Sequence, residues 1–185
     1  MATQFKKDVV QNLKVHRDTR RSVVALKVIK DVIKDILEFD RITFLEQELS
    51  PSAITLDRIA GIDCLIQKNG VLKGMATRVQ WCTDAYNTFT IRYKRDTGNK
   101  TEYAKRTDQI NTEGSIYPFW MLQAYFSRTG NFMSVGIIET KKLYKYIEDN
   151  MDKIEVRNTE NASFIVVRWD NLSPDVYYVS GDKWS

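Results

Sequence analysis

The spacing of apolar and polar positions along the chain predicts helices and strands in a mixed order. Residues 22–38 place Leu26, Ile29 and Ile33 at helical intervals, with Lys and Asp between them, so an amphipathic helix is expected there. A more basic helix is expected over residues 5–17. Strands are expected over residues 61–67, 71–82, 87–95, 119–127, 132–139, 154–156 and 163–169, with helices over about 101–111 and 140–150. The first three strands form a meander, and the whole order predicts a mixed α/β (α+β) core.

The chain shows no internal boundary. It has no internal repeat and no linker rich enough in Pro or Gly to divide it, so a single domain over residues 1–185 is expected. Within it we expect a basic N-terminal segment at residues 1–21 and a C-terminal tail at residues 171–185. The tail carries Tyr177 and Tyr178, and it either forms a last strand or docks on a partner.

Charge is distributed unevenly along the chain. The 28 Lys and Arg exceed the 24 Asp and Glu by four. Residues 1–35 and 61–110 are basic, whereas residues 36–60 are acidic and the remainder is mildly acidic. Two basic blocks around an acidic stretch suit a metal-dependent enzyme that acts on a phosphate backbone. The same pattern also suits a solvated helix face and an ordinary strand edge.

Scarce histidine and cysteine exclude several kinds of site. Cys64 and Cys82 cannot form a disulfide framework, and no Cys/His cluster exists for zinc. His16 is the only histidine, which almost excludes histidine-based catalytic triads. The sequence contains neither a signal-peptide pattern nor a run of about 18 apolar residues, so we expect a cytoplasmic, intracellular protein with no membrane partner. Carboxylates, amides, Lys, Arg and hydroxyls remain for any chemistry.

One predicted hairpin gathers polar side chains. The dipeptide Asn69-Gly70 predicts a two-residue turn, which sets the pairing of the two flanking strands. In that register Asp63 lies opposite Ala76, and Arg78 and Gln80 follow on the same face. The other face collects apolar residues for the core: Ile62, Cys64, Ile66, Met75 and Val79. An acid, a guanidinium and an amide therefore converge, either as a functional site or as a structural ion pair between strands.

This arrangement resembles the PD-(D/E)xK nuclease superfamily, also called restriction-endonuclease-like. The resemblance rests on a helix, a strand with Gly61-Ile62-Asp63, a turn, a strand ending Thr77-Arg78-Val79-Gln80, a third strand and a helix, and it covers roughly residues 22–127. It implies an αβββαβ-like core, with a mixed central sheet flanked by helices. The superfamily places an Asp on one strand and Glu-x-Lys or Glu-x-Gln on the next.

The resemblance also implies roles for individual residues. Asp63 takes the position of the metal-binding Asp, and Gln80 takes the Lys or Gln position that orients water. Arg78 stands where the superfamily has Glu, and we expect it to contact the scissile phosphate. The Mg²⁺ ion then needs a second carboxylate, for which Glu38 at the end of the first helix is the favoured choice. Other acids that could serve are Glu46 and Glu48.

A second set of residues is expected to contact nucleic acid. Arg92, Lys94, Arg95 and Lys100 surround a tyrosine and a turn, a combination that can follow a phosphate backbone. The alternative is a solvated hairpin edge, where Lys and Arg also block aggregation. Gln123, in a later strand, could face the same site as the hairpin residues.

These features predict a nucleic-acid-binding protein, with DNA favoured over RNA, that cleaves phosphodiesters as a Mg²⁺-dependent endonuclease. The alternative is a catalytically inactive module of the same fold that acts by binding nucleic acid or protein, with Arg78 marking a lost active site. A third reading is a protein-binding inhibitor that uses the aromatic tail. The predicted partners also allow a homodimer.

Overall fold

The computed structural model describes residues 25–45, 56–98 and 100–181, without the side chains of residues 58 and 59. Several predictions lie outside these residues: the helix over 5–17, the basic segment 1–21, and the acids Glu46 and Glu48. Within the described part, the mixed α/β prediction is confirmed, since helices and strands alternate around two sheets.

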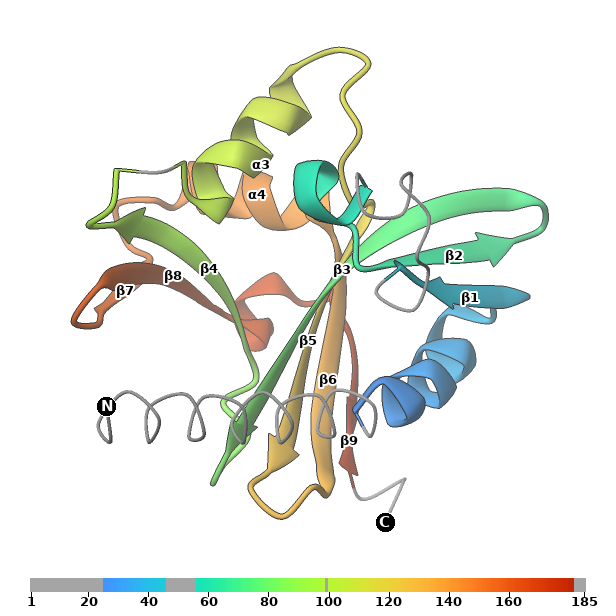
Figure 1. The fold of residues 1–185 in the computed structure, drawn as a ribbon. Coiled ribbons are helices and arrows are strands. Elements are labelled where there is room, and N and C mark those ends of the chain that lie inside the picture. The colour runs from blue at the N-terminus through green and yellow to red at the C-terminus, as the bar shows by residue number, and fades with distance from the viewer. Residues whose placement is uncertain (1–24, 46–55, 99, 182–185) are drawn as a thin grey trace, which may run out of the picture.

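The elements follow one another in an order close to the predicted one (Figure 1). Residues 25–37 form a helix. They are followed by β1 (Arg41–Phe44), the π-helical turn η2 (Leu56–Ala60), β2 (Cys64–Lys68), β3 (Val71–Cys82), β4 (Thr88–Arg95), α3 (Glu102–Asn111), β5 (Trp120–Ser127), β6 (Phe132–Glu139), α4 (Thr140–Asp149), β7 (Glu155–Asn158), β8 (Ala162–Arg168), the 3-10 helix η3 (Trp169–Leu172) and β9 (Tyr177–Ser180).

The larger sheet has the strand order β1-β2-β3-β5-β6-β9. Strands β3 and β5 are parallel, and the other neighbours in this sheet are antiparallel. Helix, β1, β2, β3, α3 and β5 thus follow the expected αβββαβ order. The assignment of strands within it was wrong, however, because the first strand is β1, a segment of four residues that was not predicted as a strand.

The predicted third strand, β4, belongs to a different sheet. It pairs with β8 in a three-stranded sheet of order β4-β8-β7. Phe89 and Ile91 of β4 are almost completely buried there with Ile165 of β8. The alternation of apolar and polar residues predicted β4 correctly. It could not show which strand β4 pairs with, since that partner lies some 75 positions away in the chain.

Two separate layers cover the larger sheet. The helix of residues 25–37 packs on one face, where Ile29 and Ile33 are completely buried. The other face packs against α4 and the smaller sheet, and here Gly136 of β6 makes room for the Trp169 ring, which a Cβ atom would strike. The amphipathic pattern of both helices therefore arises from contact with the larger sheet.

The hairpin of β2 and β3 has the predicted register. Lys68 pairs with Val71, and Cys64 pairs with Met75. The turn residues Asn69 and Gly70 have positive φ angles of 49° and 75°, as a type I′ turn requires. The apolar face predicted for this hairpin is confirmed for Cys64 and Met75, which are completely buried.

The C-terminal tail forms a last strand as far as Ser180. Strand β9 pairs with β6 at the edge of the larger sheet. Tyr177 and Tyr178 remain 51% and 67% exposed, so they pack only in part against the sheet. In the part of the chain that the structure describes, no helix combines the length and the apolar character needed to cross a membrane.

Candidate functional site

A polar cavity of about 230 Å³ lies where β2 begins, between β3, β5 and the start of α3. Its polar lining residues are Asp63, Thr77, Arg78, Thr90, Glu102, Arg106 and Gln123. We call this site the polar cavity. It contains two of the three predicted catalytic residues, together with Gln123, which the sequence also suggested.

The sheet and α3 together position these side chains. Arg78 of β3 lies directly beside Gln123 of β5, because the two strands pair in parallel. Asp63 extends the hairpin beyond β2, since its N–H donates to the carbonyl of Met75 over 2.9 Å. Glu102 reaches the cavity because Thr101 caps α3, with Thr101 Oγ1 accepting from the N–H of Ala104. An acid in the first turn of a helix is also favoured by the helix dipole.

Asp63 is held by its neighbour across the hairpin. Its carboxylate accepts hydrogen bonds from the backbone N–H of Thr77 and, over 3.1 Å, from the Thr77 hydroxyl. These donors orient the carboxylate toward β3, the strand that was predicted to carry Arg78 and Gln80 beside it. Both hydrogen bonds end on Oδ2 of the carboxylate.

Arg78 lies at the centre of the cavity's charge network. Its Nη2 is 2.6 Å from Glu102 Oε2, and its Nη1 donates to the Thr90 carbonyl over 2.5 Å. Gln80 Nε2 donates to the Thr90 hydroxyl over 3.3 Å, and the backbone N–H of Arg92 donates to Glu102 over 3.3 Å. Glu102 is therefore a site residue that the sequence reasoning missed, although the N-cap before it was a signal that placed it at a helix start.

Gln123 contributes a hydrogen-bond donor with no acceptor. The residue is only 2% exposed, and its Oε1 accepts from the N–H and the hydroxyl of Thr90 over 3.4 and 3.2 Å. Because the Thr90 N–H can only donate, the amide oxygen must face Thr90. The buried Nε2 then has no hydrogen-bond partner among the described residues, so an acceptor would be favoured beside it.

Arg106 closes the floor of the cavity from α3. Its Nη1 donates to the carbonyl of Ala60 over 2.7 Å. Gly61 is required next to it, because φ is +63° there and a Cβ atom would lie 2.8 Å from Arg106 Nη2. Burial lowers the pKa of Arg106, while the Tyr144 hydroxyl and the charge of Glu102 oppose that change. The cavity thus contains a second guanidinium held by backbone carbonyls.

The structure does not bring the two predicted metal ligands together. Glu38 follows the helix of residues 25–37 and lies 3.7 Å from Lys68 Nζ. Lys68 ends β2, whereas Asp63 precedes it, so five extended residues separate the two ends of the strand by about 16 Å. No group of three or more His, Cys, Asp or Glu side chains lies close enough to hold a metal ion in the described ranges.

The donor set of the polar cavity also differs from a magnesium site. Mg²⁺ binds oxygen ligands in near-octahedral geometry. The cavity instead presents N–H donors from Arg78, Arg106 and Gln123, and one of its acids, Glu102, is already bound to Arg78. These residues do not fit Mg²⁺ held by Asp63 and Glu38. They fit an anion.

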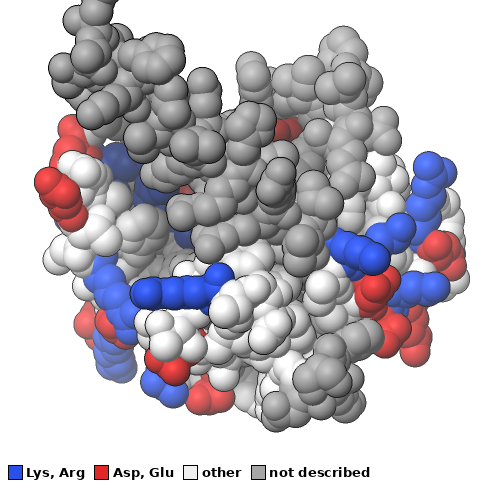
Figure 2. Space-filling model, turned by 60° about the horizontal axis from the view of Figure 1, so that its bottom comes forward, with Lys and Arg blue, Asp and Glu red and all other residues white. Residues whose placement is uncertain are grey.

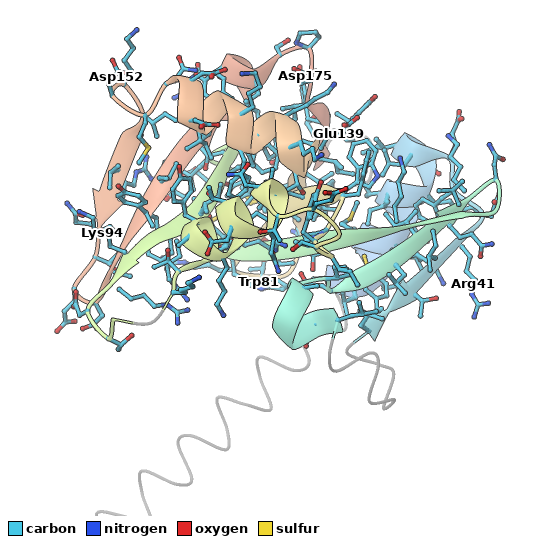
Figure 3. All side chains as sticks on the ribbon, turned by 90° about the horizontal axis from the view of Figure 1, so that it is seen from above. Arg41, Trp81, Lys94, Glu139, Asp152 and Asp175 are labelled. Carbon is cyan, nitrogen blue, oxygen red and sulfur yellow. The ribbon has the colours of Figure 1, made fainter. Side chains whose placement is uncertain are left out.

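Of the predicted nucleic-acid contacts, Arg92 lies next to this cavity, because its backbone N–H donates to Glu102. Arg92 packs over the Phe164 ring at 5.5 Å, and burial lowers its pKa, followed by repulsion from Arg95 and Arg78. Lys94 lies near one end of the molecule, on the side away from Arg41 (Figure 3). We call Arg92, Lys94 and Arg95 the basic strip. Lys100, by contrast, is paired with Asp108 over 2.6 Å.

Other charged side chains are more evenly mixed. On the face shown in Figure 2, blue Lys and Arg side chains lie among red Asp and Glu along both flanks of the molecule. Such mixing is typical of a solvated surface. The basic strip is therefore distinguished by its position beside the polar cavity, and less by its charge.

No protein-family model, curated protein or solved structure matches the chain. These comparisons do not test the resemblance to the PD-(D/E)xK superfamily, which stays a prediction from the residues and the element order of this chain. The chemistry of the site follows from its own donors and acids: two guanidiniums, one unfilled amide donor and two carboxylates that are held in place by neighbours.

Proposed function

We propose that this protein binds nucleic acid through the basic strip and the polar cavity, as a module with a nuclease-like arrangement that does not cleave its ligand. The observation that carries the proposal is Arg78. At the position where the resembled superfamily has a carboxylate, this chain has a guanidinium that lines a cavity together with a buried, unfilled Gln123 donor. Guanidinium and amide N–H groups suit phosphate oxygens.

The basic strip supports the same partner. Burial lowers the pKa of Arg92, and repulsion from Arg95 and then from Arg78 lowers it further, so cations continue from the cavity onto β4. A nucleic-acid backbone that follows β4 would relieve this repulsion, because each phosphate supplies a negative charge. Lys94 and Arg95 extend the cations to the exposed end of the strand. Binding of this kind depends strongly on salt.

Mg²⁺-dependent endonuclease activity is the second candidate. It is favoured by the αβββαβ order and by Asp63, which lines the polar cavity just before β2. The guanidinium at position 78 and the distance of Glu38 from Asp63 argue against it. A direct assay separates the two candidates.

Binding is tested with fluorescently labelled single-stranded DNA, duplex DNA and RNA of the same sequence. We expect affinity to fall by about tenfold or more between low and physiological salt, and to fall by about tenfold in the double variant Arg92→Gln/Lys94→Gln. The matched control is Lys141→Gln/Lys153→Gln, which removes the same charge elsewhere. Equal loss in both double variants, or no binding at low salt, would overturn the proposal.

Cleavage is tested by nicking of supercoiled plasmid and by degradation of labelled RNA, each with Mg²⁺, with Mn²⁺ and with EDTA. We expect no cleavage by the wild-type protein. Metal-dependent cleavage that Asp63→Ala abolishes would replace the proposal with the second candidate. Cleavage that is equal in wild type and Asp63→Ala would come from a contaminating nuclease and would leave the proposal in place.

A further inference from the structure

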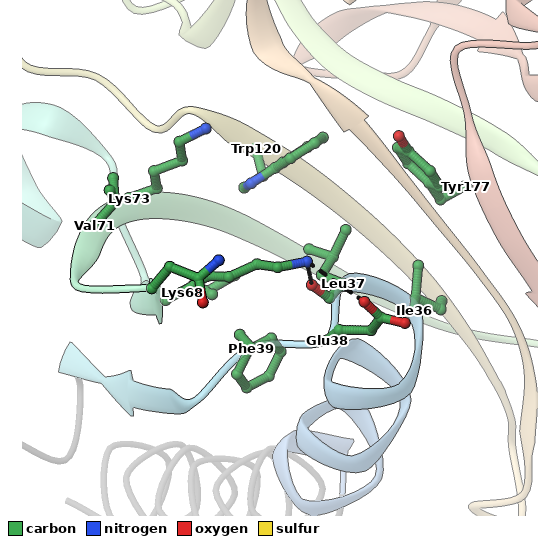
Figure 4. A pocket seen from close by; sticks show the side chains of 11 residues that line it. Ile36, Leu37, Glu38, Phe39, Lys68, Val71, Lys73, Trp120 and Tyr177 are labelled. Atoms are coloured by element: carbon green, nitrogen blue, oxygen red, sulfur yellow. Dashed lines mark hydrogen bonds and ion pairs between the residues drawn. The ribbon is translucent and has the colours of Figure 1, made fainter.

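A second, larger cavity of about 580 Å³ lies at the other end of the hairpin (Figure 4). We call it the hairpin cavity. Its apolar lining comes from Ile36, Leu37, Phe39, Ile66, Val71 and Trp120, and its polar lining from Glu38, Lys68, Asn69, Lys73 and Tyr177. A volume of this size, mostly apolar walls and a few polar groups are typical of sites for small molecules.

The walls of the hairpin cavity offer aromatic surfaces. Trp120 of β5 and Tyr177 of β9 lie on one side, and the end of the first helix, with Ile36 and Leu37, lies opposite (Figure 4). The two rings are 6.1 Å apart at an angle of 77°, an edge-to-face pair. Tyr177 is half exposed, so its ring is not covered by the rest of the described chain. A flat ring can pack against such surfaces with favourable geometry.

The two lysines of the cavity differ in their partners. Lys68 Nζ is engaged, since it donates to the Leu37 carbonyl over 2.9 Å and lies 3.7 Å from Glu38. Lys73 Nζ instead lies 3.6 Å from the centre of the Phe119 ring and 6.0 Å from that of Trp120. Within the described residues, no carboxylate lies within salt-bridge distance of Lys73.

Lys73 is therefore a half-buried residue whose ammonium group rests on aromatic rings, with no counter-charge from the described residues. A ring face compensates the charge of a cation only in part. An anionic group of a ligand would complete the compensation. Because Lys73 is beside Trp120, the anion and an aromatic ring of the ligand would lie next to each other.

We propose that the hairpin cavity binds a small anionic ligand with a planar aromatic ring, the chemistry of a nucleoside monophosphate. Its ring packs against Trp120 and Tyr177, and its phosphate pairs with Lys73. The source is either a free nucleotide or the terminal nucleotide of a strand. This site shares no residue with the polar cavity or the basic strip. The proposal is therefore independent of the proposed function and is tested separately.

Isothermal titration calorimetry with AMP, adenosine, inorganic phosphate and hexanoate tests the site. We expect AMP to bind about tenfold more tightly than adenosine, phosphate or hexanoate, because only AMP offers both a ring and an anion. Lys73→Met should weaken the binding of AMP about tenfold and leave the binding of adenosine unchanged. Lys73→Arg should retain the affinity for AMP. Lys153→Met, the same substitution at an exposed position after α4, is the control and should bind AMP as wild type does.

Three outcomes would overturn the proposal: no binding of AMP by the folded protein, equal AMP affinity in Lys73→Met and wild type, or hexanoate binding as tightly as AMP. A 5′-phosphorylated dinucleotide distinguishes the two sources. Binding tighter than that of AMP indicates the end of a strand, and weaker binding indicates a free nucleotide. Because the basic strip is intact in all Lys73 variants, loss of AMP binding with unchanged nucleic-acid binding would separate this site from the proposed function.

Discussion

The two ends of strand β2 carry two different cavities. The polar cavity, where the strand begins, contains two carboxylates and two guanidiniums, of which Arg78 and Glu102 form an ion pair. The hairpin cavity, where the strand ends, is mostly apolar and contains one ammonium group without a carboxylate partner in the described part of the chain. The two ends of β2 therefore differ in the side chains that surround them.

This difference follows from where each end lies in the fold. The segment that leads into β2 contacts α3 through Arg106, and β2 pairs with β3, which carries Arg78. An unpaired charge there would cost several kcal/mol of desolvation, so Arg78 and Glu102 neutralise each other. The far end of β2 forms the rim of the sheet next to the exposed residues Val71 and Leu72. Water reaches that end, so a lysine can remain without a partner until a ligand provides one. The ion pair of the polar cavity is therefore expected to stabilise the fold more than Lys73 of the hairpin cavity does.

The largest effect is expected from breaking the ion pair of the polar cavity. The side chains of Arg78 and Glu102 are 31% and 26% exposed. Arg78→Met and Glu102→Gln should each lower the free energy of unfolding by about 1–3 kcal/mol, because each leaves a half-buried polar partner unsatisfied. The double variant should lose less than the sum of the two, as measured by urea denaturation.

A matched comparison is the exposed i,i+4 pair of Lys145 and Asp149 on α4. Lys145→Met should cost at most about 0.5 kcal/mol. If Arg78→Met costs no more than Lys145→Met, Arg78 does not stabilise the fold. If the losses of Arg78→Met and Glu102→Gln simply add, the two side chains do not stabilise each other.

A smaller effect on stability is expected when the pH is raised, because of the buried thiol of Cys64. Burial raises the pKa of the Cys64 thiol, and the negative charge of Asp63 raises it further. The thiol stays protonated in the folded protein while it ionises in the unfolded chain, so stability is complete below the unfolded pKa and is lost as the pH rises through it. Between pH 8 and pH 10 the free energy of unfolding should fall by about 1 kcal/mol from this group.

Urea denaturation at both pH values checks this expectation. Cys64→Ala should remove most of this decrease. Cys82→Ala is the control, because the Cys82 thiol is only half buried, although burial raises its pKa as well. A decrease that persists unchanged in Cys64→Ala would mean that another group is responsible.

The smallest effect on stability is expected in the hairpin cavity. Without ligand, Lys73→Met should change the free energy of unfolding by less than about 1 kcal/mol, because only a contact between a cation and aromatic rings is lost. Thermal and urea denaturation measure it. If Lys73→Met lowers the free energy of unfolding as much as Arg78→Met does, the two cavities do not differ in their contribution to stability.

Local signals in the sequence predicted much of this structure. The turn at Asn69-Gly70 determines the register of β2 and β3, because both turn residues must adopt positive φ. The N-cap Thr101 likewise determines where α3 begins. The faces of the hairpin then follow from the two-residue period of a strand, and they place Asp63 and Arg78 on the same cavity.

Partners across the sheets were not predictable in this way. The four residues of β1 are too short for a reliable pattern, so the first strand of the sheet was missed, and β4 was assigned to the wrong sheet. The same limit applies to the site. Glu38 was chosen because it ends the first helix, but the helix leads to the far end of β2, while Glu102 enters the polar cavity through the packing of α3.

By itself, the sequence determined the helices, most strands, the hairpin register and the residues on each hairpin face, because these depend on backbone preferences and side-chain periodicity over a few positions. Only the tertiary structure decided that Arg78 pairs with Glu102 and that Lys73 rests on aromatic rings. Those partners lie 24 and more than 40 positions away in the chain. Their contacts arise from the way sheets and helices pack, and short-range patterns carry no information about that packing.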